Sequence, residues 1–219
     1  MASRALVLGG GGPVGIAWES GLLAGLARAG VDLGAADFIL GTSAGSFVGA
    51  RLAMGAEAAK LADAIVADAE SPVQSTSRGG QAAPDLSKLM RLLSAAQGAE
   101  LTPTEARIEV GAYALAATTM DEAAFIASFG RSFAGLPEDT WPARGFACTA
   151  VDAETGAFQL WSAEAGVAVT RAVASSCAVP GVYPPITLQG RRWIDGGVRS
   201  ATNADMATGH EVVVVVSVM

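Results

Sequence analysis

The pattern of hydrophobic and polar positions predicts an α/β protein. Apolar runs at 5–8 and 38–40 each lead into a glycine-containing turn, and helix-compatible segments follow at 16–29 and 47–54. Strand, turn and helix in this order form the repeating unit of α/β folds. The C-terminal third predicts further elements: a hairpin of strands at 145–151 and 157–162 joined by a turn at 152–156, a helix at 164–175, a strand at 191–195, and a β-branched run at 211–218 suited to a central parallel strand.

The middle of the chain, at about 56–135, predicts a helical insertion between the two strand-bearing parts. Thr102-Pro103-Thr104-Glu105 has the composition of a helix start, with a capping threonine and a glutamate three residues later. Residues 71–84, rich in Ser, Gly and Pro, predict an exposed loop. These helices either cover the sheet or, through 86–101, line an apolar entrance for acyl chains.

Composition favours one domain over residues 1–219, because the 51% hydrophobic content is spread along the whole chain. No apolar run approaches the ~18 to 20 residues of a membrane span, and the N-terminus lacks the order of a signal peptide. A soluble, cytoplasmic protein is therefore expected. The net charge of −7 disfavours nucleic acid and anionic membranes, so that any transient membrane contact would be apolar. Cys148 and Cys177 are expected to be free, buried thiols without metal-ligand spacing.

The segment Gly41-Thr42-Ser43-Ala44-Gly45 has the form Gly-x-Ser-x-Gly and lies between a predicted strand and a predicted helix. This is the context of a nucleophile elbow, in which a strained backbone exposes a serine at the N-terminus of a helix. The partial positive charge at that helix end stabilises a developing anion. Ser43 is therefore the candidate nucleophile, although an ordinary turn would share this short pattern.

The first predicted turn contains Gly10-x-Gly12-x-x-Gly15, which allows two functions. The spacing fits a dinucleotide-binding fingerprint, with Asp32 near the position of the ribose-binding acid. Alternatively, the loop presents backbone N–H groups as an oxyanion hole. The serine elbow about 30 residues downstream favours the oxyanion hole, and no clear strand precedes Asp32.

A hydrolytic serine needs a proton acceptor, and the chain offers two candidates. His210 is the only histidine, and the order Ser43, Asp195, His210 matches α/β-hydrolases. However, His210 precedes the last predicted strand, whereas sites in such folds form at the carboxyl ends of strands. Asp195 ends its predicted strand and is followed by Gly196 and Gly197, which leave room for close approach. It is therefore the preferred base.

Four ordered blocks resemble those of patatin-like phospholipases over nearly the whole chain. They are Gly10 to Gly15, Gly41 to Gly45, Ala174 to Gly181 with Pro184-Pro185, and Asp195-Gly196-Gly197. The resemblance implies a three-layer α/β/α fold with a mostly parallel central sheet, and hydrolysis of acyl esters of phospholipids, lysophospholipids or related lipids without a metal or other cofactor.

The resemblance also implies residue roles. Ser43 would be the nucleophile and Asp195 the proton acceptor of a Ser-Asp dyad. The oxyanion hole would comprise Gly10, Gly11, Gly12, Gly15 and Ala44, and the supporting glycines would be Gly41, Gly45, Gly196 and Gly197.

Two features depart from the family pattern. Val14 stands where the family usually has Arg or Lys, which leaves the N–H groups of Gly11, Gly12 and Ala44 to stabilise an oxyanion. The chain also stops in or just after the last strand, where the family continues, so it is either a short member or an incomplete sequence. These departures leave open a non-catalytic lipid-binding or interaction module on the same fold.

Overall fold

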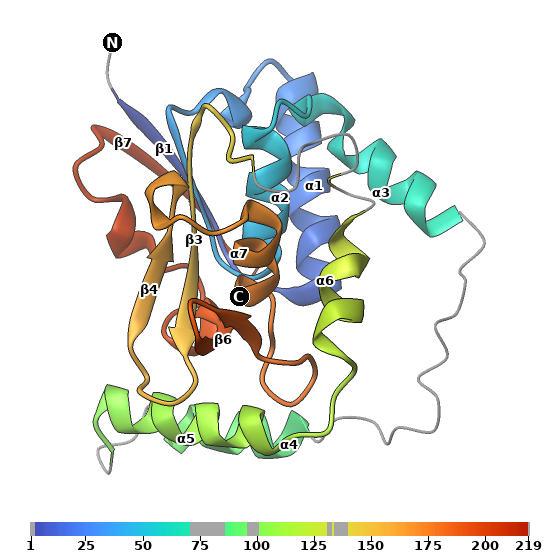
Figure 1. Cartoon of the computed structure of the whole chain (residues 1–219). Coiled ribbons are helices and arrows are strands. Elements are labelled where there is room, and N and C mark those ends of the chain that lie inside the picture. Colours follow the sequence, from blue (N-terminus) through green and yellow to red (C-terminus); the bar gives the residue numbers. More distant parts are fainter. Residues whose placement is uncertain (1–2, 71–85, 96–100, 131–132, 134–139, 219) are drawn as a thin grey trace.

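A computed structural model describes residues 3–70, 86–95, 101–130, 133 and 140–218 (Figure 1). The loop expected at 71–84 lies outside these residues. The described residues form seven strands in one sheet: β1 (Arg4–Leu8), β2 (Phe38–Gly41), β3 (Gly145–Asp152), β4 (Phe158–Trp161), β5 (Ile186–Leu188), β6 (Arg191–Asp195) and β7 (Val212–Val216).

The strand order is β5-β6-β3-β2-β1-β7, with β4 paired to β3. Strands β7, β1, β2 and β3 run parallel, whereas β4 and β6 run antiparallel to β3, and β5 antiparallel to β6. The expected mostly parallel sheet and the expected 145–162 hairpin are both confirmed.

The position of β7 differs from the expected one. It pairs in parallel with β1, as expected, but ends the strand order instead of lying at its centre. Its valines 212, 213 and 215 are exposed. A β-branched run favours a strand with apolar faces, but the pattern carries no information about which strands lie on either side. The central placement was therefore wrong.

The α-helices described are α1 (Gly12–Arg28), α2 (Ala44–Ala53), α3 (Leu61–Glu70), α4 (Leu86–Ala95), α5 (Pro103–Ala116), α6 (Glu122–Gly130) and α7 (Val169–Ser176). The short 3-10 helices are η1 (Leu33–Ala35), η2 (Ala58–Lys60), η3 (Ala163–Ala165), η4 (Gly196–Val198) and η5 (Ala204–Ala207).

The sheet lies between two layers, which confirms the α/β/α arrangement. Helices α1, α2, α6 and α7 gather on one face (Figure 1), where the largest apolar cluster includes Leu6, Ile39, Phe47 and Trp161. The opposite face carries a smaller cluster in which Val7 and Leu40 contact Ala207 of η5. Within the described residues, one layer is therefore thick and the other thin.

The elements described between β2 and β3 are all helices, which agrees with the insertion expected at 56–135. Helix α5 begins at the expected capping box, in which Thr102 Oγ1 accepts from the Glu105 N–H and the Glu105 side chain accepts from the Thr102 N–H. Helices α4 and α5 lie across the turn that joins β3 and β4 (Figure 1). There, a Cβ at Gly111 would meet the Ala153 carbonyl oxygen at 1.9 Å.

Candidate active site

Ser43 occupies the turn between β2 and α2, with φ 53° and ψ −119°. A positive φ is unusual for a residue with a Cβ, and such strained residues concentrate at functional sites. The neighbouring glycines make the turn possible. A Cβ at Gly41 would lie 2.3 Å from Ser46 Cα, and one at Gly45 would lie 2.2 Å from the Leu8 carbonyl oxygen. The geometry of Gly41 to Gly45 is thus that of a nucleophile elbow.

Backbone hydrogen bonds fasten the elbow to the end of β1. The Thr42 N–H donates to the Leu8 carbonyl at 3.0 Å, and the Gly45 N–H donates to the Gly9 carbonyl at 2.9 Å. The elbow and the glycine loop are therefore held together as one unit.

Strand register brings Asp195 to the height of Ser43. Gly41 pairs with Cys148 across β2 and β3, and Asp195 pairs with Ala150 from the other side. Ala150 lies two residues beyond Cys148, as Ser43 lies two residues beyond Gly41. Strand β3 continues for four residues beyond Cys148, the partner of the last residue of β2. The antiparallel strand β6 pairs with this extension and ends there at Asp195.

Asp195 and Ser43 are both buried, with 4% and 6% of their surface exposed, and the Ser43 hydroxyl lies close enough to the Asp195 carboxylate to influence its pKa. Burial raises the pKa of Asp195 to about 6, while hydrogen bonds donated by the Ser43 hydroxyl and the Gly197 N–H oppose that rise. The Gly197 N–H lies 2.7 Å from Asp195 Oδ1. Since an ordinary aspartate titrates near 3.9, Asp195 is a stronger base than usual and is still mostly ionised at neutral pH.

The glycine loop contains two kinds of N–H group. The Gly10 N–H donates to the Ala201 carbonyl, and the Gly15 N–H to the Gly11 carbonyl, both at 2.8 Å. By contrast, the N–H groups of Gly11, Gly12 and Ala44 have no acceptor among the described residues. Gly12 and Ala44 begin α1 and α2, where N–H groups lack an intrahelical partner. Three donors are thus free near Ser43.

Val14, the departure from the family pattern, lies in the first turn of α1 with 73% of its surface exposed. A valine at this position brings no cation to the glycine loop. The positive end of α1 and the free N–H groups remain as sources of positive potential.

The last residue of α7 and the residue after it support Ser43 from a third side. Ser176 Oγ accepts from the Ser43 N–H at 3.1 Å, and the Cys177 thiol donates to the Ser43 carbonyl at 3.2 Å. Burial, together with the charge of Asp195, raises the pKa of the Cys177 thiol, so that it remains protonated. Both cysteines are free, as expected, but the contact between Cys177 and Ser43 was not anticipated.

His210 lies at the other edge of the sheet from Ser43. Its ring stacks on Phe38, the first residue of β2, with centroids 5.3 Å apart. Ser43 lies two residues beyond the last residue of the same four-residue strand, which spans roughly 13 Å. The structure therefore does not bring His210 to the elbow, in agreement with the preference for Asp195.

The dinucleotide interpretation does not match the positions of its residues. Asp32 is exposed and caps η1, before β2 begins, whereas the glycine loop follows the end of β1. Since β1 and β2 are parallel, the acid and the loop lie at opposite edges of the sheet. In a dinucleotide site, the acid and the loop meet at the same edge.

The described residues contain neither a cluster of metal-ligating side chains nor a helix that could span a membrane. No group of three or more His, Cys, Asp or Glu side chains within them could hold a metal ion. None of their helices combines the length and apolar character needed to cross a membrane.

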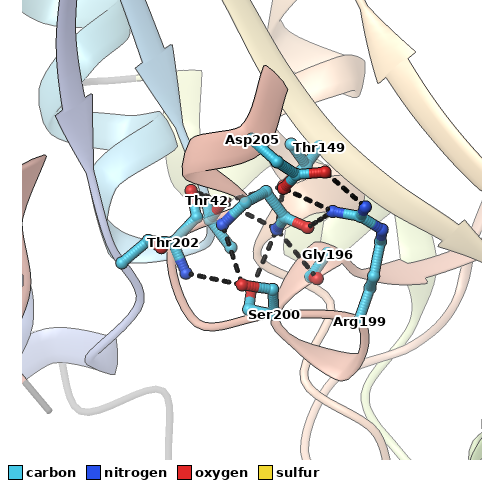
Figure 2. A network of polar contacts seen from close by, with 8 residues as sticks. Thr42, Thr149, Gly196, Arg199, Ser200, Thr202 and Asp205 are labelled. Atoms are coloured by element: carbon cyan, nitrogen blue, oxygen red, sulfur yellow. Dashed lines mark hydrogen bonds and ion pairs between the residues drawn. The ribbon is translucent and has the colours of Figure 1, made fainter. Parts of the chain in front are cut away.

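Sequence reasoning missed several polar residues that surround the site. Thr42 and Thr149 are fully buried and joined through their hydroxyl groups at 2.9 Å (Figure 2). Asn203 is fully buried and contacts both. A polar residue without a motif around it gives no signal of burial, although Asn203 lies only eight positions after Asp195.

Comparison with known proteins agrees with the geometry. The family model described as Patatin-like phospholipase matches residues 6–208, so the chain belongs to the patatin-like phospholipase family. A comparison with curated protein sequences finds no significant match.

One of the matching solved structures has a TM-score above 0.5 and shows a similar fold. VipD from Legionella pneumophila is 16% identical, with a TM-score of 0.51, and the match covers 91% of this chain and 47% of VipD. The type III effector ExoU is 22% identical, with a TM-score of 0.38, over 83% of this chain and 40% of ExoU. The ExoU-SpcU complex of Pseudomonas aeruginosa matches at 24% identity and a TM-score of 0.38, over 83% and 37%. This chain thus spans less than half the length of these proteins.

Proposed function

We propose that this protein is a serine hydrolase that cleaves carboxylic esters of phospholipids, lysophospholipids or related lipids through a Ser43–Asp195 dyad. The observation that carries the proposal is the placement of the strained Ser43 beside the buried Asp195, whose pKa is raised to about 6 by burial and is influenced by the Ser43 hydroxyl. A base of this strength can accept a serine proton during attack and return it to a leaving group near neutral pH.

In the proposed reaction, Ser43 Oγ attacks the ester carbonyl carbon while its proton passes to Asp195. The carbonyl oxygen becomes an oxyanion that accepts hydrogen bonds from Gly11, Gly12 and Ala44. Gly10 and Gly15 hold the loop in shape through their own hydrogen bonds. As the C–O bond breaks, Asp195 returns the proton to the leaving alcohol, and an acyl-enzyme remains.

Water completes the cycle. Asp195, again ionised, takes a proton from a water molecule that attacks the acyl-enzyme carbonyl. The second tetrahedral intermediate collapses as Asp195 protonates Ser43 Oγ, which releases the fatty acid.

A lipid substrate is supported by the family, because the matching model is described as Patatin-like phospholipase. Ile194 precedes Asp195 and belongs to a cluster formed with Leu89 of α4 and Val110 of α5. Val179 and Val198 pack against the same cluster. Ile194 faces away from Asp195, because consecutive side chains of a strand point to opposite faces. Ile194, Leu89 and Val110 are buried in the core, whereas Val179 and Val198 are half-buried. An acyl chain would therefore meet these two valines rather than the core residues.

We also propose that the protein acts in the cytoplasm and meets lipid transiently at a membrane surface. The net charge of −7 favours an apolar contact over electrostatic attraction to anionic lipid. Sedimentation with neutral and anionic vesicles tests this point. Binding only to anionic vesicles would contradict it.

The test of the activity is fatty-acid release from a panel of phospholipids, lysophospholipids and neutral lipids, measured by mass spectrometry. We expect release by the wild-type protein, and a loss of several orders of magnitude in Ser43→Ala, by analogy with knockouts of serine triads. Binding of lipid without release would instead support a lipid-binding module. Equal release by Ser43→Ala would contradict the proposed nucleophile.

A further inference from the structure

A buried polar network joins the two segments that carry the dyad (Figure 2). Its centre is Asn203, which follows Thr202, is fully buried and has φ 49°. Besides Ser43 and Gln189, it is the only non-glycine residue with positive φ among those described. Two of these three unusual residues thus lie in or next to the site.

The amide nitrogen of Asn203 faces four oxygen atoms. They are Thr42 Oγ1 at 3.1 Å, Thr149 Oγ1 at 3.3 Å, the Gly196 carbonyl at 3.2 Å and the Ser200 carbonyl at 2.9 Å. Thr42 is the residue before Ser43, and Gly196 is the residue after Asp195. A single side chain therefore contacts the chain neighbours of both dyad residues.

The carbonyl end of the same amide is fixed by a cation. Asn203 Oδ1 accepts from Arg199 Nη1 at 2.8 Å. Arg199 in turn forms an ion pair with Asp205, with hydrogen bonds of 2.6 and 3.0 Å, and lies 4.5 Å from the centre of the Phe158 ring. Because arginine only donates, the oxygen must face Arg199 and the NH₂ group must face the interior.

These contacts explain why asparagine suits this position. Asparagine tolerates the left-handed backbone better than most residues. Aspartate would turn an acceptor toward the Gly196 and Ser200 carbonyls, which are acceptors themselves. Glycine would keep the backbone but remove the amide.

Thr149 of β3 packs closely against the turn that follows Asp195. A Cβ at Gly196 would lie 2.1 Å from Thr149 Oγ1, so the Asp195-Gly196-Gly197 turn presses directly on β3. Thr149 also bonds to Thr42, as shown above, and thus lies between the elbow and the turn. Asn203, the residue before η5, contacts both threonine hydroxyls through its amide nitrogen.

We propose that Asn203 is a positioning residue that sets the distance and orientation between the Ser43 hydroxyl and the Asp195 carboxylate by tying Thr42 to Gly196. This inference rests on the proposed hydrolase function. Asn203 does not itself contact the reacting atoms. It holds the turn after β2, which carries Ser43, and the turn after β6, which begins with Gly196, in a fixed relative position during proton transfer.

Loss of the amide has a distinct expected signature. A small displacement between reacting groups can cost about 10²-fold in rate, and this cost falls on kcat, because the acyl chain contacts lie elsewhere. A longer Ser43–Asp195 hydrogen bond also lowers the pKa of Asp195 less, so that this pKa rises. A purely structural role would change stability without moving the pH profile.

The experiment compares Asn203→Gly with Gln189→Gly, measuring the melting temperature, kcat, KM and the pH profile on p-nitrophenyl butyrate. Gln189 has φ 52° but is exposed and bonded to Ala165, away from the dyad, which makes it a matched control. We expect Asn203→Gly to lower kcat by about tenfold or more, to leave KM within about twofold, and to shift the acid limb to higher pH. Gln189→Gly should change none of these.

If Asn203→Gly does not fold, a second pair of variants tests the same network. Thr149→Val removes the hydroxyl that bonds to Thr42 and Asn203 and should lower kcat in the same way, whereas Thr149→Ser keeps a hydroxyl and should retain most of the wild-type kcat. A folded Asn203→Gly or Thr149→Val protein with unchanged kcat and pH profile would overturn the positioning role alone. A folded wild-type protein without esterase activity would overturn the proposed function, and this inference with it.

Discussion

The Gly197 N–H donates a 2.7 Å hydrogen bond to Oδ1 of Asp195. This bond fixes the carboxylate from within its own turn while the Ser43 hydroxyl donates to it from the elbow. The carboxylate that we propose as the base thus has a defined orientation. Burial would otherwise favour the neutral acid, and the two donors keep the pKa low enough for Asp195 to be ionised at neutral pH.

The activity should depend on pH through Asp195. Because the carboxylate must be ionised to accept a proton, we expect kcat/KM on a short-chain ester to fall about tenfold per pH unit below about 6. An unperturbed aspartate would place this limb near 3.9. A stopped-assay profile from pH 4 to 8 measures it, and a limb near pH 4 would argue against a buried base.

Replacement of His210 separates the two possible bases. A histidine also titrates near 6.5, so the acid limb alone does not identify the base. Since His210 stacks on Phe38 at the opposite edge of the sheet, we expect His210→Ala to keep kcat/KM within about twofold and to leave the limb in place. If His210→Ala were inactive and Asp195→Asn active, a triad would replace the dyad.

Gly196 should not tolerate a side chain. A Cβ there would lie 2.1 Å from Thr149 Oγ1 and 2.6 Å from the Thr149 carbonyl oxygen. We expect Gly196→Ala to lower the free energy of unfolding by about 1–3 kcal/mol, as overpacking does, and to lower kcat by displacing Asp195. Denaturant unfolding and ester hydrolysis measure the two effects.

Gly21 provides the control for that substitution. It lies on the exposed side of α1, and a Cβ would meet no atom within 4 Å. Gly21→Ala should raise the free energy of unfolding by roughly 0.5–1 kcal/mol and leave kcat unchanged. Equal behaviour of the two variants would show that the contact with Thr149 does not constrain the turn.

Glu19 makes stability depend on pH. It is fully buried on α1, and burial raises its pKa from 4.5 to about 8. The Gly9 N–H partly opposes this rise, although it is already bonded to the Val216 carbonyl at 3.0 Å. Neither carboxyl oxygen of Glu19 has a hydrogen-bond partner of its own among the described residues.

The sign of this dependence follows from the raised pKa. Above pH 4.5 the unfolded chain releases a proton from Glu19 that the folded protein keeps. The contribution of protonated Glu19 to the free energy of unfolding is therefore complete below pH 4.5 and is lost as the pH rises from there through 8, at about 1.4 kcal/mol per pH unit. Glu19→Gln should therefore raise the melting temperature at pH 7 to 9 more than at pH 4.5. The exposed Glu109→Gln on α5 serves as the control, and parallel curves for all three proteins would exclude a buried, protonated Glu19.

Local patterns were sufficient to predict most of the elements and to select Ser43 and Asp195 as the candidate dyad. Gly41 to Gly45 and Asp195 to Gly197 combine residue types with backbone demands that few sequences meet. The lone histidine could be set aside because its place before a parallel strand fixes the edge at which it lies. In these cases the determining physics, backbone strain and strand direction, is contained in a few adjacent residues.

What the sequence could not show depends on contacts between distant segments. Strand β7 lies at the end of the strand order, and strand order is not encoded in any single segment. The short apolar run at 191–195 likewise does not reveal that β6 is antiparallel to β3, the direction that brings Asp195 to Ser43. Asn203 and Glu19 carry no motif, so their burial emerges only after folding. The division of the glycine loop into bonded and free N–H groups likewise depends on Ala201, far along the chain.

The central claim is that Asp195 activates Ser43, and the most direct measurement is the rate and site of labelling by a fluorophosphonate, followed by intact-mass and peptide mass spectrometry. We expect one adduct per chain, located on Ser43 and absent from Ser43→Ala. In folded Asp195→Asn, labelling should slow by about 10²-fold or more, the usual contribution of a general base. Labelling of another residue, or an Asp195→Asn protein that reacts as fast as the wild type, would contradict the dyad.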